Sequence, residues 1–279
     1  MGFAAQRLQR LKRYSLTLRR FWSSALAAEL EYPLNALIEL VAVLGNLAGS
    51  LFVLTLLYAH GRDLGGWSWN DALMVLGLYT LLDGFTSCLL QPNLSRIVGH
   101  VQNGTLDFVL LKPIDSQFWL STRQISPWGL PAVIAGIGLI GWSLAQSASP
   151  ELWSQPGLWI SRLLLAGALL TAAAAILYSL WFLLAGLSIW FVKIWNATEV
   201  LRYTLVAGRY PVAAYPAALR VLFTFVLPVA FLTTVPAEAL LGRASAGWAA
   251  GSVLAAALAL TFSRGFWRQA LRHYTSASS

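Results

Sequence analysis

The sequence predicts an all-α protein that crosses a membrane six times. Between Leu34 and Trp267 about six long apolar stretches follow one another, and about 20 apolar residues suffice to span the hydrocarbon core. The composition is 58% hydrophobic and only 11% charged, whereas a soluble domain carries about 25% charged residues. The Lys and Arg residues fall almost entirely into alternate connections between these stretches, which is a topology signal of membrane proteins.

Residues 1–30 precede the first span and have a helical period. Leu8, Leu18 and Trp22 fall on one arc at 100° per residue, while most of the basic residues fall on the other arc. We therefore expect an amphipathic interfacial helix, the elbow helix, before the chain turns inward at Pro33. A disordered basic tail is the alternative. No cleaved signal peptide is expected, because the basic residues extend far ahead of the first apolar run.

Six apolar runs give the expected spans. They are residues 34–59, 71–91, 128–146, 158–191, a fifth span starting near 217, and 246–262. The fourth run could stay helical over roughly 50 Å at 1.5 Å per residue, so it should tilt or project into water. Pro228 and Pro236 interrupt the fifth run and remove backbone donors. A kink or a re-entrant element is therefore expected over residues 228–243, before the last span.

The distribution of positive charge predicts the orientation. If the amino terminus is cytoplasmic, only Arg62, Arg162 and Arg243 of the 19 Lys and Arg residues fall on the outer side. This bias predicts that both termini are cytoplasmic. The net charge of +8 could also indicate nucleic-acid binding, but the basic residues are not gathered with aromatics on a polar folded surface. No nucleic-acid partner is expected.

Motifs for catalysis and cofactor binding are missing. The chain contains no G-x-x-x-x-G-K-[ST], H-E-x-x-H or G-x-S-x-G motif. His60, His100 and His273 fall in three separate connections and Cys88 is the only cysteine, so no metal site is expected. A G-x-G-x-x-G pattern begins at Gly136 inside an apolar span, where close helix packing is the expected role. The same role is expected for two small-residue pairs, Gly45 with Gly49 and Gly247 with Gly251.

Ionisable residues inside the spans are candidates for function. Glu39 and Asn46 are seven residues apart in the first span and share a helical face, and Asp83 in the second span has Tyr79 one turn away. A carboxyl group in lipid must pair, become protonated or face an aqueous cavity, so these side chains should point into the bundle. Two interpretations remain open: a substrate or proton path, and a structural polar clamp between helices.

The longest inner connection, residues 92–127, contains an apolar knob. Gly104 ends a first short apolar pattern, and the knob Phe108–Leu111 follows between Asp107 and Lys112. A soluble loop would not normally expose such a cluster, so the knob should lie on the membrane surface or fill a groove in a partner. Docking into a cytoplasmic protein is the preferred interpretation.

Three motifs carry a resemblance to a known family. They are GTLDFVLLKPIDSQF at 104–118, GRYPVAAYP at 208–216 and FTFVLPVAFLTTVPAEALLG at 223–242. These segments resemble the inner-loop motif and the later motifs of bacterial ATP-binding-cassette (ABC) exporter permeases of the second type. The similarity extends over nearly the full chain.

This resemblance implies a permease subunit in the bacterial inner membrane, without a cofactor or an enzymatic activity of its own. ATP and Mg²⁺ would be bound by separate ABC ATPase subunits, and the permease would pair with an identical or homologous permease within membrane lipid. The exported substrate would be amphipathic or hydrophobic. The implied ATPase contacts are Arg96, Gly104, Thr105, Asp107, Phe108, Leu111, Lys112 and Pro113. The candidate residues for the translocation pathway are Glu39, Asn46, Asp83, Pro228, Pro236 and Glu238.

Two other classes of membrane protein remain as alternatives. A membrane-embedded lipid-modifying enzyme would need His, Asp or Ser clustered at one depth, and the three histidines are scattered. An ion-coupled secondary transporter would show internal repeats with matched broken spans. Only the fifth span is strongly broken here, so the permease interpretation is preferred.

Overall fold

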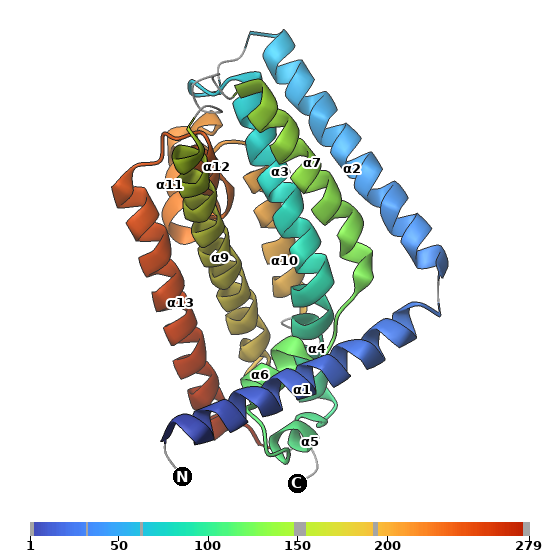
Figure 1. The fold of residues 1–279 in the computed structure, drawn as a ribbon. Coiled ribbons are helices and arrows are strands. Elements are labelled where there is room, and N and C mark those ends of the chain that lie inside the picture. Colours follow the sequence, from blue (N-terminus) through green and yellow to red (C-terminus); the bar gives the residue numbers. More distant parts are fainter. Residues whose placement is uncertain (1–2, 32, 62–63, 148–154, 192–194, 276–279) are drawn as a thin grey trace.

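The computed structural model describes residues 3–31, 33–61, 64–147, 155–191 and 195–275, and these residues form a helical bundle (Figure 1). The helices are α1 (Phe3–Glu29), α2 (Pro33–Ala59), α3 (Trp69–Phe85), α4 (Gln91–Gln102), α5 (Leu106–Leu110), α6 (Ser116–Thr122), α7 (Leu130–Ser147), α9 (Pro156–Gly186), α10 (Trp195–Leu205), α11 (Ala217–Val221), α12 (Val235–Leu240) and α13 (Ala246–His273). No strand occurs in these parts of the chain. The predicted all-α class is confirmed.

Five helices of the described residues are long and apolar enough to span a membrane. They are Leu37–Ala59, Trp69–Gln102, Pro127–Ser147, Pro156–Ile189 and Ala246–His273. A sixth candidate is the bent pair Ala217–Val226 and Ala230–Leu240, whose axes differ by 76°. The break includes Pro228, as expected from a residue that cannot donate a backbone hydrogen bond. The chain is therefore an all-α polytopic membrane protein.

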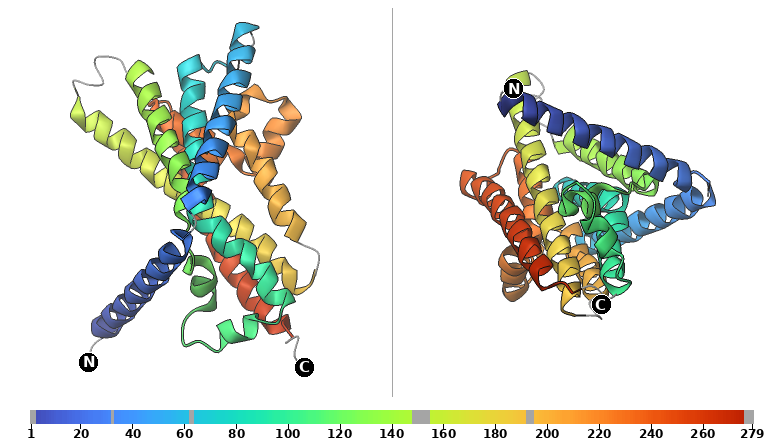
Figure 2. Two further views of the ribbon diagram at one scale, coloured as in Figure 1. Left: turned by 90° about the vertical axis from the view of Figure 1, so that its right-hand side faces the viewer. Right: turned by 90° about the horizontal axis from the view of Figure 1, so that it is seen from below.

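Helix α1 lies across one end of the bundle, separate from the spanning helices (Figures 1 and 2). The chain bends between α1 and α2, so the polar α1 and the apolar α2 run in different directions. Helices α4, α5 and α6 lie at this same end, where α13 also finishes. The helix predicted over residues 1–30 is thus present, and it lies beside the 92–127 loop.

Helix α3 continues through the π-helical turn Thr86–Leu90 into α4, giving one 34-residue helix. Glycines allow α3 to lie very close to α7: a Cβ atom on Gly84 would collide with the backbone of Gly129 and Val133, and one on Gly136 would collide with Leu81. At its amino end α3 is capped by Ser68, whose hydroxyl accepts a hydrogen bond from the backbone N–H of Asp71. The second span is therefore firmly fixed against the third.

The glycine predictions are confirmed only in part. Gly136 makes the expected close approach, but Gly138 has no atom within 4 Å of its Cβ position. Gly45 and Gly49 on α2 likewise have open space there. Within the described part of one chain no helix packs against these three glycines; for Gly45 and Gly49 the reason is that α2 stands apart from the rest of the bundle along much of its length (Figure 1).

Residues 195–209 fall in the inner connection between the fourth and fifth expected spans, and they form a helix and a short turn. Helix α10 and the short turn Val206–Arg209 pack against α9 and α3 (Figure 1). The segment carries Arg202 and Arg209, and these charges lower its hydropathy below that of a span. Of the other charged residues used for the orientation, Arg62 and Lys193 lie outside the described residues.

Candidate functional site

The 92–127 connection folds into α4, α5 and α6 and divides the apolar knob into two faces. Gly104 adopts φ +67° between α4 and α5, a conformation that favours glycine. Leu106 and Val109 are almost completely buried, at 0% and 1% exposure. Phe108 and Leu111 are 67% and 80% exposed. One face of α5 therefore anchors the loop, while the other presents apolar side chains outward.

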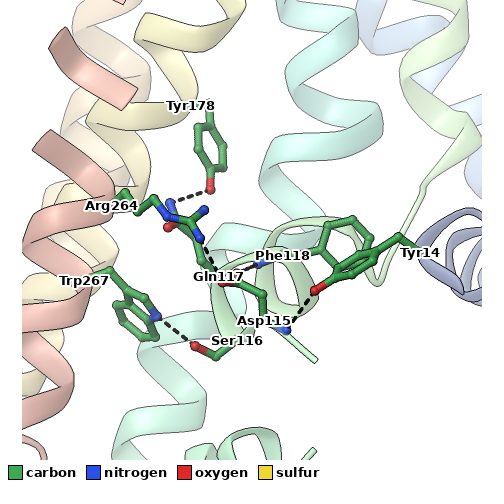
Figure 3. A network of polar contacts seen from close by, with 8 residues as sticks. All are labelled: Tyr14, Asp115, Ser116, Gln117, Phe118, Tyr178, Arg264 and Trp267. Atoms are coloured by element: carbon green, nitrogen blue, oxygen red, sulfur yellow. Dashed lines mark hydrogen bonds and ion pairs between the residues drawn. The ribbon is translucent and has the colours of Figure 1, made fainter. Parts of the chain in front are cut away.

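Helix α6 connects this loop to the elbow helix and to the last span (Figure 3). The Asp115 carboxylate caps α6 by accepting a hydrogen bond from the Phe118 N–H at 2.9 Å. Its other oxygen lies 3.3 Å from the Arg264 guanidinium on α13. The backbone N–H of Asp115 donates to the Tyr14 hydroxyl on α1, and the Tyr14 ring packs edge-on against Phe118.

A second set of contacts ties α6 to the fourth and sixth spans. The Trp267 indole N–H on α13 donates to the Ser116 hydroxyl at 3.1 Å. The Gln117 amide donates to the Tyr178 hydroxyl on α9 at 3.0 Å (Figure 3). Since α4 continues from α3, the loop is joined by covalent continuity or by hydrogen bonds to α1, α3, α9 and α13. Displacement of α6 would thus be transmitted to several membrane helices.

The residues assigned to ATPase contact all lie in this loop, but in different surroundings. Arg96 and Thr105 line a hollow of ≈ 500 Å³ between α4 and α6. Lys112 lies over the ring of Trp119, 5.0 Å from its centre. Burial raises the pKa of Tyr274, and the negative charge of nearby Asp107 raises it further. Asp107 therefore lies close to the segment that follows α13. The backbone carbonyl of Pro113 accepts a hydrogen bond from Arg13 of the elbow helix.

The predicted pathway residues of the first two spans come together at one cavity. Glu39 and Asn46 of α2 and Asp83 of α3 line a cavity of ≈ 200 Å³ beside the bundle helices. Arg202 and Arg209 complete its charged lining. Two carboxyl groups and two guanidinium groups thus surround one space, although no described pair among them lies within the 4.0 Å of a salt bridge.

A smaller, mostly apolar hollow adjoins this cavity and shares Asp83 and Arg202 with it. Trp181 and Thr233 line the smaller hollow. The Trp181 indole nitrogen, the Thr233 hydroxyl and the Arg209 Nε atom are buried without a hydrogen-bond partner among the described protein atoms. Buried polar atoms usually have a partner, so water or a ligand would be expected at these positions. The arrangement can hold a polar group beside an apolar one.

The remaining pathway candidates do not line either hollow. Pro228 lies at the bend between the two halves of the broken span, while Pro236 and Glu238 lie on α12. Their joint assignment to one pathway with Asp83 remains a prediction. Among the described residues no group of three His, Cys, Asp or Glu is placed to hold a metal ion.

Comparison with known families decides between the classes of membrane protein. Residues 44–278 match the profile of the ABC-2 family transporter proteins. The chain belongs to this family. No curated protein and no solved structure matches the chain. An ABC-2 permease is a transport subunit in the membrane that associates with ABC ATPase subunits.

Several residues at the two sites of this ABC-2 permease could not be recognised from the sequence. Tyr14, Tyr178, Arg264 and Trp267 contact α6 from three separate helices, at sequence separations of 57 to 151 residues. No local pattern marks such contacts. Arg202 gave no such signal either, because an arginine outside the apolar runs is an ordinary topology signal.

Proposed function

We propose that this permease is half of a dimeric, ATP-driven exporter in a bacterial inner membrane, with both termini cytoplasmic. Two ATPase subunits bind beneath the dimer and hydrolyse ATP, while the permeases provide the passage for an amphipathic or hydrophobic substrate. The second permease is identical or homologous. Two observations support the direction of transport and the partners. They are family membership and the motifs at residues 104–118, 208–216 and 223–242.

The division of α5 into a buried and an exposed face is the observation on which the proposal rests. Phe108 and Leu111 are outward-facing apolar side chains on a helix that Leu106 and Val109 hold in place. Burying two such side chains in a partner contributes about 1.5–3 kcal/mol each. A soluble ATPase with an apolar groove is the partner that fits this surface, and the hydrogen bonds of α6 link the surface to the spanning helices.

The proposed transmission starts with closure of the ATPase subunits on ATP. The closure displaces α5, and α6 passes the displacement to α1, α9 and α13 through the contacts of Asp115, Ser116 and Gln117. Helix α4 passes it along the continuous helix to Asp83, which borders the charged cavity. The cavity then changes between two arrangements, so an event in the cytoplasm opens or closes a passage in the membrane.

A double substitution, Phe108→Ala with Leu111→Ala, tests this function. The first readout is the amount of ATPase subunit that co-purifies with the permease. The second is the rate of thiol labelling at Asn46→Cys, measured with and without ATP. This cysteine is introduced together with Cys88→Ala, so that the cavity carries the only thiol of the chain. We expect both signals to fall at least tenfold, because the two side chains contribute together about 3–6 kcal/mol to docking.

The matched control is Leu254→Ala with Leu258→Ala on α13. These leucines are 61% and 62% exposed, so the control removes a comparable amount of exposed apolar surface away from α5. We expect it to retain both signals. Normal ATPase binding by the α5 variant would refute docking at this surface. A permease that shows no bound ATPase and no response to ATP even as wild type would refute the function itself.

A further inference from the structure

A basic hollow lies between the elbow helix and the 92–127 loop, called the coupling loop from here on. It has a volume of ≈ 300 Å³, and its basic residues are Arg20 on α1, Lys112 after α5 and Arg123 after α6. It adjoins the ≈ 500 Å³ hollow that contains Arg96 and shares Trp119 and Arg123 with it. None of the described residues lining either hollow is acidic. Four permanent positive charges therefore face this space without a carboxylate in its lining.

Two of the cations in this hollow lie against one aromatic ring. Lys112 and Arg123 both lie over the ring of Trp119, with their charged atoms 5.0 Å and 4.5 Å from its centre. Two like charges beside one ring repel each other, and an anion between them would offset this repulsion. Phe21 of α1 packs edge-on against the same indole, which brings the elbow helix to the hollow.

Two carboxylates on the helices around the hollow have other partners. Glu29 at the end of α1 accepts a hydrogen bond from the Trp128 indole N–H at 2.6 Å. Asp115 at the start of α6 is paired with Arg264. Neither residue lines the basic hollow. No described carboxylate thus lines the hollow, so an anion that binds there would come from outside the described part of the chain.

The position of the hollow relative to the membrane indicates where this anion comes from. Arg20 and Ala28 of α1 line it and precede α2, a spanning helix that begins at Pro33. At 1.5 Å per residue, both lie within about 20 Å of helix length from the start of that span. An amphipathic helix of this kind lies at the depth of lipid headgroups. The phosphate esters of anionic lipids are therefore the anions closest to the hollow.

We infer that the basic hollow formed by Arg20, Lys112 and Arg123 binds the phosphate headgroup of an anionic phospholipid from the leaflet in which α1 lies. The lipid connects the elbow helix to the loop between α4 and α6. Arg123 and Lys112 neutralise the phosphate, and Arg20 of α1 binds it from the other side of the hollow. The ATPase docks on the exposed side chains Phe108 and Leu111, and Lys112 borders both this surface and the hollow.

The test compares the wild-type chain with Arg20→Gln/Arg123→Gln. Purified full-length permease is titrated in detergent with phosphatidylglycerol, phosphatidylcholine or inorganic phosphate, and bound lipid is counted by native mass spectrometry. We expect selective retention of phosphatidylglycerol by the wild type. The double variant should retain it about 30-fold less well, because each basic residue near an anionic lipid contributes about a factor of five.

Two control variants exclude a general effect of charge or folding. Arg268→Gln/Arg272→Gln removes two exposed positive charges from the end of α13 and should retain phosphatidylglycerol as the wild type does. Arg20→Lys/Arg123→Lys preserves the charges and should restore most of the binding. If the double Gln variant fails to fold, a loss of affinity in the Arg20→Gln single variant of about fivefold still tests the inference.

Three results would overturn the inference. The first is equal retention of phosphatidylcholine and phosphatidylglycerol by the wild type. The second is saturation of the same hollow by inorganic phosphate with the affinity of the lipid, which would indicate a soluble phosphate ligand. The third is unchanged lipid binding in Arg20→Gln/Arg123→Gln together with lost ATPase binding, which would show that an acidic surface of the ATPase fills the hollow.

Discussion

Asp115 has two separable roles at the centre of the contacts around α6. Its carboxylate caps the helix through the Phe118 N–H, and it forms an ion pair with Arg264 at 3.3 Å. The cap should contribute about 1 kcal/mol, with a range of about 0.5–2. The side chains of the ion pair are 37% and 55% exposed, so solvent screening limits its contribution to about 0–1 kcal/mol. The cap should therefore dominate.

Two substitutions distinguish the roles. Asp115→Asn preserves the cap, because asparagine is as effective at that position, but it removes the charge. Asp115→Ala removes both interactions. We expect Asp115→Ala to lower the free energy of unfolding by about 1–2 kcal/mol and Asp115→Asn by about 0–1 kcal/mol. Arg264→Gln, which leaves the cap in place, should resemble Asp115→Asn.

The assay is thermal unfolding of the detergent-solubilised permease, followed by tryptophan fluorescence. The same variants are then assembled with the ATPase, and the rate of ATP hydrolysis per complex is measured. If α6 transmits movement, the loss of ATPase stimulation should follow the same order as the loss of stability. Equal destabilisation by Asp115→Asn and Asp115→Ala would refute the reasoning, since it would make the ion pair the dominant interaction.

Three further predictions concern helix packing, the coupling loop and the cavity. Gly84→Ala should destabilise the permease by about 1–3 kcal/mol, because the new Cβ collides with backbone atoms of α7 and of the turn before it. Gly138→Ala is the control, since its Cβ would enter open space, and it should leave the unfolding temperature nearly unchanged. Asp107→Ala and Lys112→Ala should each preserve ATPase binding but weaken the ATP-dependent labelling of the cavity at least several-fold, and unchanged labelling would contradict this. Asp83→Asn should reduce the same labelling change without altering the amount of co-purified ATPase, and a loss of the folded protein instead would favour a structural clamp.

The spans and the elbow helix could be predicted because their signals are local. Apolar runs of about 20 residues mark the spans through the cost of exposing polar groups to lipid. The helical period over residues 1–30 and the break at Pro228 are also local signals, because each depends on residues within a few helical turns. The knob Phe108–Leu111 could also be predicted, since it is an apolar cluster between two charged residues, Asp107 and Lys112, in a polar loop.

The tertiary part of both sites could not be predicted. Arg202 and Arg209 resembled loop residues because a hydropathy profile depends only on local composition. It carries no information about the carboxyl groups that share the cavity with these arginines. Gly45 and Gly49 match a packing motif, but no local pattern reveals whether a second helix lies opposite them. The contacts of α6 with Tyr178 and Trp267 depend on how the bundle closes, which a single sequence does not encode in any short segment.

One continuous helix, the second span, reaches from the coupling loop to the charged cavity. Asp83 borders the charged cavity, and Gln102 ends the same helix at the coupling loop, about 29 Å away at 1.5 Å per residue. The π-helical turn Thr86–Leu90 lies between them. Here Gly129 lies so close to Gly84 and Cys88 that a Cβ atom would not fit. Since the third span braces the helix at this turn, we expect a push on α4 to reach the segment that carries Asp83 as a movement of the braced helix rather than as compression of the turn.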